Sequence, residues 1–379
     1  MKKIIFLIVS FVLLVSTLIY AKENELNIIS PNALLYDVTY DKILYEKNIN
    51  EKIPNASTTK ILTAIVAYEN SNMDDIVEIS TKAASIGGSK INLRKGDKVK
   101  MDSLMKGLLM SSGNDAAIAI AEHVGGSVQE FCDLMNKKAV ELGAQNTNFT
   151  TPHGLDNDEH YTTLNDLLIF SKYFMEIPYL REIANTEKTI IEINNYEKEL
   201  RSTNEMLFLY DGVNGIKTGY TSKAGRCLIT SIESGDRTLI TMVLGCETKR
   251  QRTEETIKLI SYGYDNFEVV DIFENMKKNF EMRIRKSEKD KYKLEINGNR
   301  KVLLAKNEKK DIRYEYEITE VLTAPIEKES CVGTIKVLIK DNIITEFQIK
   351  LPYTIERKDV FEYFLEILKK QNLYLEIKT

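Results

Sequence analysis

Hydrophobic and polar positions in the first part of the chain alternate between strand and helix periods. Residues Ala33 to Tyr45 form two apolar runs around a polar turn near Tyr40-Asp41, which predicts a β-hairpin. Residues Thr58 to Asn70 are apolar nearly all round, as expected of a buried helix. The pattern therefore begins with a hairpin followed by a helix in the core.

Three further helices are predicted by apolar spacing, and they span Met101 to Gly125, Leu164 to Met175 and Thr253 to Tyr262. The first of them is interrupted by Ser112-Gly113-Asn114, a costly sequence for a helix interior. Before the last helix, two strongly apolar runs flank Gly235-Asp236, which predicts a hairpin buried at the centre of a sheet.

The pattern changes near residue 275. Lys and Glu dominate from Met276 to Lys291, and short runs of alternating apolar and polar residues follow, separated by turn residues such as Asn297-Gly298. These features predict a small all-β domain over residues 276–355. The alternating apolar residues are Tyr292, Leu294, Ile296, Ile312, Tyr314, Tyr316, Ile318, Ile335, Val337 and Ile339.

A short amphipathic helix is predicted over residues 359–372. Its apolar residues have helical spacing, and charged residues occupy the opposite face. This helix could lie on a membrane surface or dock against the β domain, and its short stripe predicts weak membrane affinity. The apolar residues are Phe361, Phe364, Leu365 and Leu368.

The N-terminus has the layout of an export signal. Two lysines precede an apolar run from Ile4 to Tyr20, and Ala21 supplies a small residue for cleavage, which predicts a signal peptide at 1–21. Ile19 is large for its position before the cut, and the apolar run approaches the ~20 residues that span a bilayer. An uncleaved anchor is therefore the alternative. In both cases the rest of the chain is expected at the outer face of the cytoplasmic membrane or in the cell wall.

Composition excludes several classes of function. With 43% hydrophobic and 28% charged residues and a net charge of −4, the chain is typical of a globular protein, and nothing indicates nucleic acid as a partner. The cysteines are too few for a disulfide framework, and free thiols are favoured over a Cys227–Cys246 pair. No Cys/His cluster has zinc spacing, so neither a metal nor another cofactor is expected. The cysteines are Cys132, Cys227, Cys246 and Cys331.

Three short motifs carry the candidate chemistry: Ser57-Thr58-Thr59-Lys60, Ser112-Gly113-Asn114 and Lys217-Thr218-Gly219. Each alone has an ordinary structural explanation, as a helix cap followed by a surface lysine or as a turn. Ser-x-x-Lys even recurs at Ser103 to Lys106, without companions at the right spacing. The ordered set is more specific, because each motif supplies a different part of one acyl-transfer reaction.

A serine hydroxyl becomes nucleophilic when a neighbouring base takes its proton. Ser57 and Lys60 share one face at a helix start, and a buried lysine loses its charge readily, so Lys60 is the candidate base. Ser112 is the candidate proton relay to the leaving group. Asn114 is expected to bind a substrate amide and to hold Lys60.

The third motif is predicted to bind the substrate. Lys217 adds a positive charge, Thr218 offers a hydroxyl to a substrate carboxylate, and Gly219 lets a substrate backbone approach an edge strand. The backbone N–H groups of Ser57 and Tyr220 could form an oxyanion hole.

This motif set resembles the one shared by class A β-lactamases and penicillin-binding proteins. The segments PNASTTKILTA, LLMSSGNDAAIAIAEHVGGS, NFTTPHGLD and VNGIKTGYTSKAGRCLITS are similar to the low-molecular-weight penicillin-binding proteins, the serine D-alanyl-D-alanine carboxypeptidases. The resemblance covers about Ala33 to Phe267, and LTAPIEKESCVGTIKV resembles that family's C-terminal β domain. It implies an α/β (α+β) fold, with a transpeptidase-like catalytic domain at 25–268 that has a mostly antiparallel sheet and a helical subdomain. A small all-β domain then follows.

The resemblance also implies a role for each site residue. Ser57 would be acylated by the D-Ala-D-Ala end of a peptidoglycan stem peptide, Lys60 would accept its proton, and Ser112 and Asn114 would complete the second motif. Lys217 and Thr218 would hold the terminal carboxylate. β-Lactam antibiotics would be covalent inhibitors. The chain departs from the family's pattern in two places. Tyr220 follows the third motif where some relatives carry histidine, and Glu329-Ser330 stands in the β domain where a glycine turn is common.

Arg252 and His153 are the softer assignments. Arg252, at the start of a helix, could reach the substrate carboxylate or form a surface ion pair. His153, in the loop Thr151-Pro152-His153-Gly154-Leu155, could shape the pocket wall or serve only the structure.

Three alternatives remain. A class A β-lactamase needs a loop glutamate, and Tyr161 stands at the start of the corresponding Glu-x-x-Leu-Asn pattern. A D,D-endopeptidase could use the same scaffold. A non-catalytic peptidoglycan-binding envelope protein would not need to keep Ser57 together with Lys60.

Overall fold

The computed structural model describes residues 26–194, 196–289, 291–296 and 298–370, so the predicted signal peptide at 1–21 lies outside it. The chain divides into two compact units between Tyr264 and Asp265. Each unit has a hydrophobic core of its own.

The first unit is built around a five-stranded antiparallel sheet in the order β2-β1-β9-β8-β7. Both predicted hairpins are present, and the second turns at Gly235, whose φ of +58° favours glycine. Strand β7 forms one edge of this sheet, so one of its sides is open to a ligand. The strands are β1 (Asn32–Asp37), β2 (Lys42–Lys47), β7 (Val213–Thr221), β8 (Gly225–Ser234) and β9 (Arg237–Cys246).

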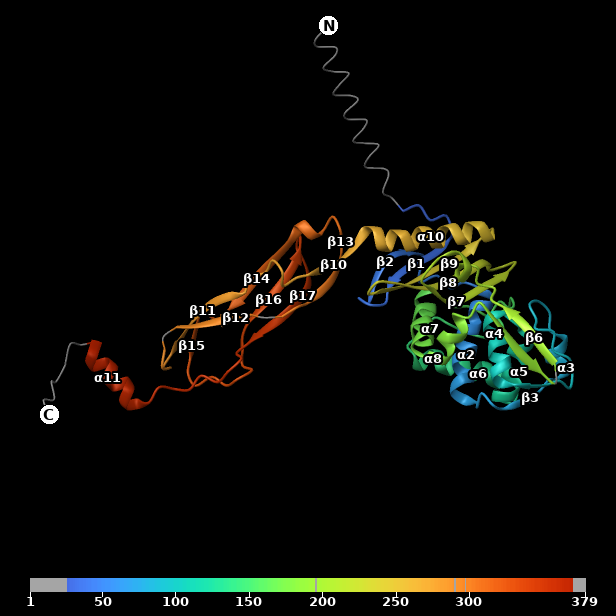
Figure 1. The fold of residues 1–379 in the computed structure, drawn as a ribbon, viewed down its shortest axis with the longest axis horizontal. Helices are drawn as coiled ribbons and strands as arrows, with labels where there is room; N and C mark the ends of the chain where they lie inside the picture. The colour runs from blue at the N-terminus through green and yellow to red at the C-terminus, as the bar shows by residue number, and fades with distance from the viewer. Residues whose placement is uncertain (1–25, 195, 290, 297, 371–379) are drawn as a thin grey trace, which may run out of the picture. The chain divides into compact units, whose positions relative to one another are not determined.

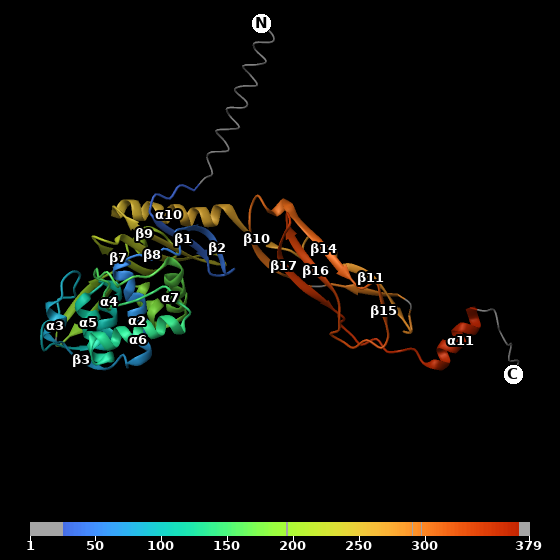
Figure 2. The ribbon, with the colours of Figure 1, turned by 180° about the vertical axis from the view of Figure 1, so that it is seen from behind.

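Helices cover both faces of the sheet. The views in Figures 1 and 2 agree that α10 runs along one face, whereas α2, α4, α5, α7 and α8 gather on the other. The helices are α2 (Lys60–Asn70), α3 (Thr81–Ser85), α4 (Met101–Met110), α5 (Asn114–Gly125), α6 (Val128–Glu141), α7 (Leu164–Glu176), α8 (Pro178–Ala184), α9 (Met206–Leu209) and α10 (Lys249–Asn266).

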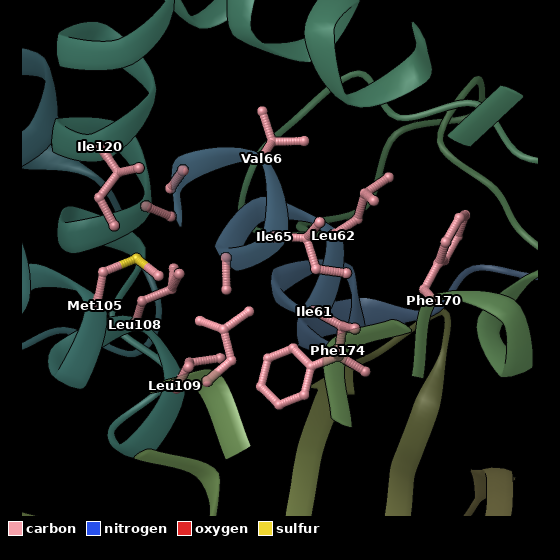
Figure 3. Close-up of a cluster of buried hydrophobic side chains, with 14 of the residues drawn as sticks. Ile61, Leu62, Ile65, Val66, Met105, Leu108, Leu109, Ile120, Phe170 and Phe174 are labelled. Atoms are coloured by element: carbon pink, nitrogen blue, oxygen red, sulfur yellow. The ribbon is translucent and has the colours of Figure 1, made fainter. Parts of the chain in front are cut away.

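Helix α2 occupies the centre of the helical layer, and its first eight residues are all buried. The prediction of burial on all sides is confirmed, because α4 and α7 both contribute side chains to the cluster around it. Burial of one such Leu or Ile side chain stabilises the fold by roughly 1.5–3 kcal/mol. Figure 3 shows Ile61, Leu62, Ile65 and Val66 of α2 with Met105, Leu108 and Leu109 of α4, Ile120 of α5, and Phe170 and Phe174 of α7.

Helix α10 is tied to the sheet by a buried ion pair. Arg237 Nε donates to Asp37 Oδ2 at 2.8 Å, which links the first residue of β9 to the last residue of β1. The same guanidinium donates from Nη2 to the Gly263 carbonyl of α10 at 3.1 Å. Two small hairpin-like pairs complete this unit: β3 (Ile76–Glu78) with β4 (Lys98–Lys100), and β5 (Lys188–Ile193) with β6 (Tyr196–Arg201).

The second unit is the small all-β domain that the alternating pattern predicts. Its strand pairing starts before residue 276, because β10 pairs with β13. The charged segment after Met276 contains β11, where Met282 and Ile284 are buried between exposed charged residues. The strands are β10 (Phe267–Asp271), β11 (Asn279–Arg285), β12 (Lys291–Glu295), β13 (Lys301–Ala305), β14 (Ile312–Ile318), β15 (Val321–Thr323), β16 (Cys331–Ile339) and β17 (Asn342–Lys350).

Helix α11 (Val360–Lys370) follows this unit, and the predicted range 359–372 runs two residues past the last described position. Its Phe361 and Phe364 side chains are exposed. Between residues 26 and 370, none of the described helices combines the length and hydropathy needed to cross a bilayer. Cys227 and Cys246 are buried free thiols, so the favoured expectation for them holds.

Candidate active site

Ser57 lies in a single 3-10 turn, Ala56–Thr59, immediately before α2. The predicted start of the α-helix at Thr58 is therefore wrong, since the regular helix begins at Lys60. The reason is local: Thr58 Oγ1 donates to the Asn55 carbonyl at 2.6 Å, and Thr59 Oγ1 donates to the Ala56 carbonyl at 2.8 Å. Such side-chain bonds to the backbone compete with α-helical geometry.

Lys60 is completely buried, and its amine has three hydrogen-bond partners. Nζ donates to Asn114 Oδ1 at 2.8 Å and to the His153 carbonyl at 2.9 Å, and it lies 2.9 Å from Ser57 Oγ. Burial lowers the pKa of Lys60 well below its usual value, and the nearby positive charge of Lys217 lowers it further. The carboxylate of Asp115 acts in the opposite direction but is the smallest influence.

These three partners fix where the proton can move. A neutral amine keeps two N–H donors and one lone pair. The amide oxygen of Asn114 and the carbonyl of His153 can only accept, so they take the two N–H groups. The lone pair is then left for the Ser57 hydroxyl, which can donate. The geometry therefore suits proton transfer from Ser57 to Lys60.

The Ser112-Gly113-Asn114 motif forms the break between α4 and α5. Ser112 is buried and has a left-handed backbone with φ of +57°, which ends the helical path after Met110. Asn114 is the first residue of α5, and its side chain also donates from Nδ2 to the Gly87 carbonyl at 2.7 Å. The break thus directs the Asn114 side chain to Lys60, and Ser112 lies two residues before Asn114 in the chain.

Lys217 and Thr218 lie in the middle of edge strand β7. Lys217 is buried, and its Nζ donates to the Thr218 carbonyl at 3.1 Å. Burial lowers the pKa of Lys217 to about 7, helped by the charge of Arg252. The Thr218 hydroxyl lies 2.8 Å from the hydroxyl of Thr203.

Gly219 is pressed against the turn that carries the nucleophile. A Cβ atom at this position would lie 3.1 Å from the backbone nitrogen of Ser57 and 3.2 Å from the Asn55 carbonyl. The close approach predicted for a substrate backbone is thus made by the chain itself. The next residue, Tyr220, has an exposed ring, with the Arg226 guanidinium carbon 4.3 Å from its centroid.

His153 contributes its backbone rather than its ring to Lys60. The ring Nδ1 accepts from the Leu155 N–H at 3.1 Å, and burial lowers the pKa of His153 to about 3, so the ring is neutral. Gly154 follows with φ of +80°, and a Cβ there would meet the Ala56 carbonyl at 1.8 Å. The loop is therefore held tightly against the turn of Ser57.

Sequence reasoning missed two supporting residues. His160 Nε2 lies 2.9 Å from Thr59 Oγ1, and Asp115 accepts from the backbone N–H groups of Ile91 and Leu93 at 3.0 Å each. Neither belongs to a recognisable motif. The sequence signal for Asp115 is an acidic residue between Asn114 and the apolar run that follows it.

Arg252 is buried on the first turn of α10. Of the two alternatives, an ion pair is present, but the arginine that forms it is not at the surface. Its guanidinium pairs with Glu205, whose side chain remains partly exposed, and Nη1 donates to the Cys227 carbonyl at 3.3 Å. The positive charge of Arg252 contributes to the lowered pKa of Lys217. Arg252 therefore adds positive charge behind the third motif.

The chain is similar to known proteins over most of its length. Residues 20–248 match the family model of D-alanyl-D-alanine carboxypeptidase, and residues 267–357 match the C-terminal domain of penicillin-binding protein 5. The chain is 33% identical to the D-alanyl-D-alanine carboxypeptidase DacF of Bacillus subtilis, over 84% of each chain. It is also 33% identical to the D-alanyl-D-alanine carboxypeptidase DacC of Escherichia coli, over 86% of this chain and 85% of the relative.

Solved structures give the same result for the fold. The D-alanyl-D-alanine carboxypeptidase DacD from Francisella tularensis superposes with a TM-score of 0.70 at 27% identity, covering 88% of this chain and 95% of the other. Penicillin-binding protein 5 from Haemophilus influenzae gives a TM-score of 0.67 at 28% identity, with 87% and 98% covered.

Proposed function

This chain belongs to the D-alanyl-D-alanine carboxypeptidase family, and we propose that Ser57 attacks the bond between the last two D-alanines of a peptidoglycan stem peptide. The enzyme is a serine-type hydrolase of the cell wall. The observation that carries the role of Ser57 is the amine of Lys60 at 2.9 Å, whose two other partners can only accept.

Acylation follows from this arrangement. The Ser57 oxygen forms a bond to the carbonyl carbon of the penultimate D-alanine while its proton passes to Lys60 Nζ. The backbone N–H groups of Ser57 and Tyr220 stabilise the oxyanion. Ser112 relays a proton to the leaving nitrogen, and free D-alanine departs. Water then attacks the ester, Lys60 takes the proton of that water, and the serine is regenerated.

Substrate binding falls to the third motif. The terminal carboxylate accepts a hydrogen bond from the Thr218 hydroxyl in the positive field of Lys217, with Arg252 adding charge behind it. Asn114 holds a substrate amide as well as Lys60. Gly219 keeps the backbone of the turn close, and Tyr220 and His153 shape the pocket rim.

We also propose that penicillins acylate Ser57 and that the protein works outside the cytoplasmic membrane. The apolar run at Ile4 to Tyr20 supports export, and the exposed Phe361 and Phe364 of α11 support a weak peripheral contact with the membrane. The double variant Phe361→Ser/Phe364→Ser should sediment with lipid vesicles less than wild type does. Equal sedimentation of both proteins would oppose it.

The test of the nucleophile uses intact mass and product release together. Wild type should gain the mass of one penicillin in a long-lived adduct and release D-alanine from an acyl-D-Ala-D-Ala peptide. Ser57→Ala should do neither. Rapid turnover of penicillin would favour a β-lactamase, and D-alanine release by Ser57→Ala would contradict the proposed nucleophile. The mass also reports whether residues 1–21 have been removed.

A further inference from the structure

A cavity lies next to the third motif, because one of its lining residues, Thr203, contacts Thr218. It has a volume of about 620 Å³, within the usual range for small-molecule sites. None of the residues assigned above to the reaction lines it. The lining consists of Arg201, Ser202, Thr203, Glu205, Phe208, Lys249, Arg250, Thr253 and Glu254.

Two contacts join this cavity to the carboxylate-binding residues. Thr203 lines the cavity, and its hydroxyl lies 2.8 Å from that of Thr218. Glu205 lines it as well, and its carboxylate pairs with Arg252. A leaving residue whose α-carboxylate is held at Thr218 therefore has the cavity just beyond the Thr203 side chain.

The two acidic residues of the lining already have cationic partners. Glu205 pairs with Arg252 and also accepts from Thr253 Oγ1 at 3.0 Å. Glu254 accepts from Arg250 Nε at 2.7 Å. The carboxylates of the lining are thus largely balanced by their own partners.

Two cations of the lining are not balanced in this way. Within the described part of the chain, neither Lys249 nor Arg201 forms an ion pair, and the Arg201 guanidinium carbon sits 4.6 Å from the Phe208 ring centroid. Lys249 is also the first residue of the 18-residue helix α10, whose N-terminal end favours anions. The cavity therefore offers net positive charge to a ligand.

We propose that this cavity is a leaving-group subsite that accepts the carboxylate side chain of an acidic C-terminal D-residue. The proposal rests on the proposed function, because it concerns the residue that departs when Ser57 is acylated. The methyl group of D-alanine is too short to use the cavity, whereas a D-glutamate side chain carries a carboxylate toward Lys249 and Arg201. These two residues are then determinants of specificity.

The test compares kcat/KM for three peptides that differ only in the last residue: acyl-D-Ala-D-Ala, acyl-D-Ala-D-Glu and acyl-D-Ala-D-Gln. D-Gln has the shape of D-Glu without its charge. Wild type should have a higher kcat/KM for the D-Glu peptide than for the D-Gln peptide. Each of the two cations should account for about a two- to fivefold part of this preference, as for partly exposed ion pairs. The preference should shrink at high salt.

Lys249→Gln and Arg201→Gln should each reduce the preference for D-Glu and leave D-alanine release unchanged. Lys258→Gln, an exposed lysine of the same helix outside the cavity, is the matched control and should keep the preference. Equal rates for D-Glu and D-Gln in wild type, or a preference that survives both cavity variants together, would overturn the subsite while D-alanine release continues. Loss of release from all three peptides in wild type would instead overturn the proposed function, and the subsite with it.

Discussion

Gly219 on β7 lies so close to Ser57, on the turn before α2, that a Cβ on the glycine would be 3.1 Å from the backbone nitrogen of the serine. The edge strand and the nucleophile are therefore positioned against each other by direct backbone contact. A Cβ at this distance forces one of the two segments to shift by a few tenths of an ångström.

Gly219→Ala should slow acylation of Ser57 by penicillin, because the turn must move away from β7. Misplacement of reacting groups by about 1 Å can cost on the order of 10²-fold in rate, so a loss of about 10-fold or more is expected for this smaller shift. Stopped-flow acylation with a fluorescent penicillin measures the rate. Gly235→Ala is the control, since it strains a distant hairpin turn at φ +58° with nothing within 4 Å of the new Cβ. Equal acylation rates for Gly219→Ala and wild type would show that the close contact of Gly219 with the Ser57 turn does not position the nucleophile.

Asn114→Ala should also slow acylation, by roughly 10- to 100-fold, because a buried donor left without its partner costs about 1–3 kcal/mol. The variant removes the acceptor 2.8 Å from Lys60 Nζ. Asn136→Ala is a matched control: its amide makes two bonds to the Phe149 backbone, at 2.7 and 2.9 Å, and none to Lys60. Both variants should be destabilised, but only Asn114→Ala should lose acylation rate. A similar loss in the two variants would point to a general effect of stability.

The pH profile of kcat/KM for D-alanine release should have two limbs. Acylation needs Lys60 as a neutral amine, and burial lowers the pKa of Lys60, so activity rises with pH as this proton leaves. Carboxylate binding needs Lys217 protonated, and its pKa of about 7 makes activity fall above that pH in the free enzyme.

Lys217→Arg separates the two limbs, because arginine keeps its charge at every pH in the assay. The descending limb should move to higher pH in this variant and the ascending limb should stay. A profile of the variant that superposes on that of wild type would show that Lys217 is not the group that titrates above neutrality.

Lys217→Met should raise the thermal stability while it weakens substrate binding. The folded pKa of about 7 lies below the unfolded value, so the buried charge destabilises the folded state; this cost is complete below about pH 7 and is lost as the pH rises toward the unfolded pKa. Since one pKa unit corresponds to about 1.4 kcal/mol, the gain from removing this cost is roughly 2–4 kcal/mol at neutral pH, shrinking as pH approaches about 10. Calorimetry at both pH values measures it, with the exposed Lys258→Met as control. A lower melting temperature for Lys217→Met at neutral pH would be the opposite result.

The sequence predicted the parts of the site whose identity lies in side chains. The spacing of Ser57 and Lys60 predicted that their side chains lie together. The break at Ser112 to Asn114 predicted that the Asn114 amide holds the Lys60 amine. Apolar runs around Gly235 likewise predicted the central hairpin, because two strands that are buried on both faces need continuous hydrophobicity.

Contacts made by the backbone escaped prediction. The acceptor that completes the environment of Lys60 is the carbonyl of His153, and any residue could supply a carbonyl there. The observed start of α2 differs from the predicted one because two threonine hydroxyls donate to nearby backbone carbonyls, and the apolar pattern gives no sign of such bonds. Glu205, the partner of buried Arg252, is distant in sequence and belongs to no motif.

Among the residues that the structure describes, every group that bonds to Lys60 Nζ belongs to the unit that ends at Tyr264, and the second unit has a separate core. A substitution that loosens the core of the second unit is therefore expected to leave the hydrogen bonds of Lys60 in place.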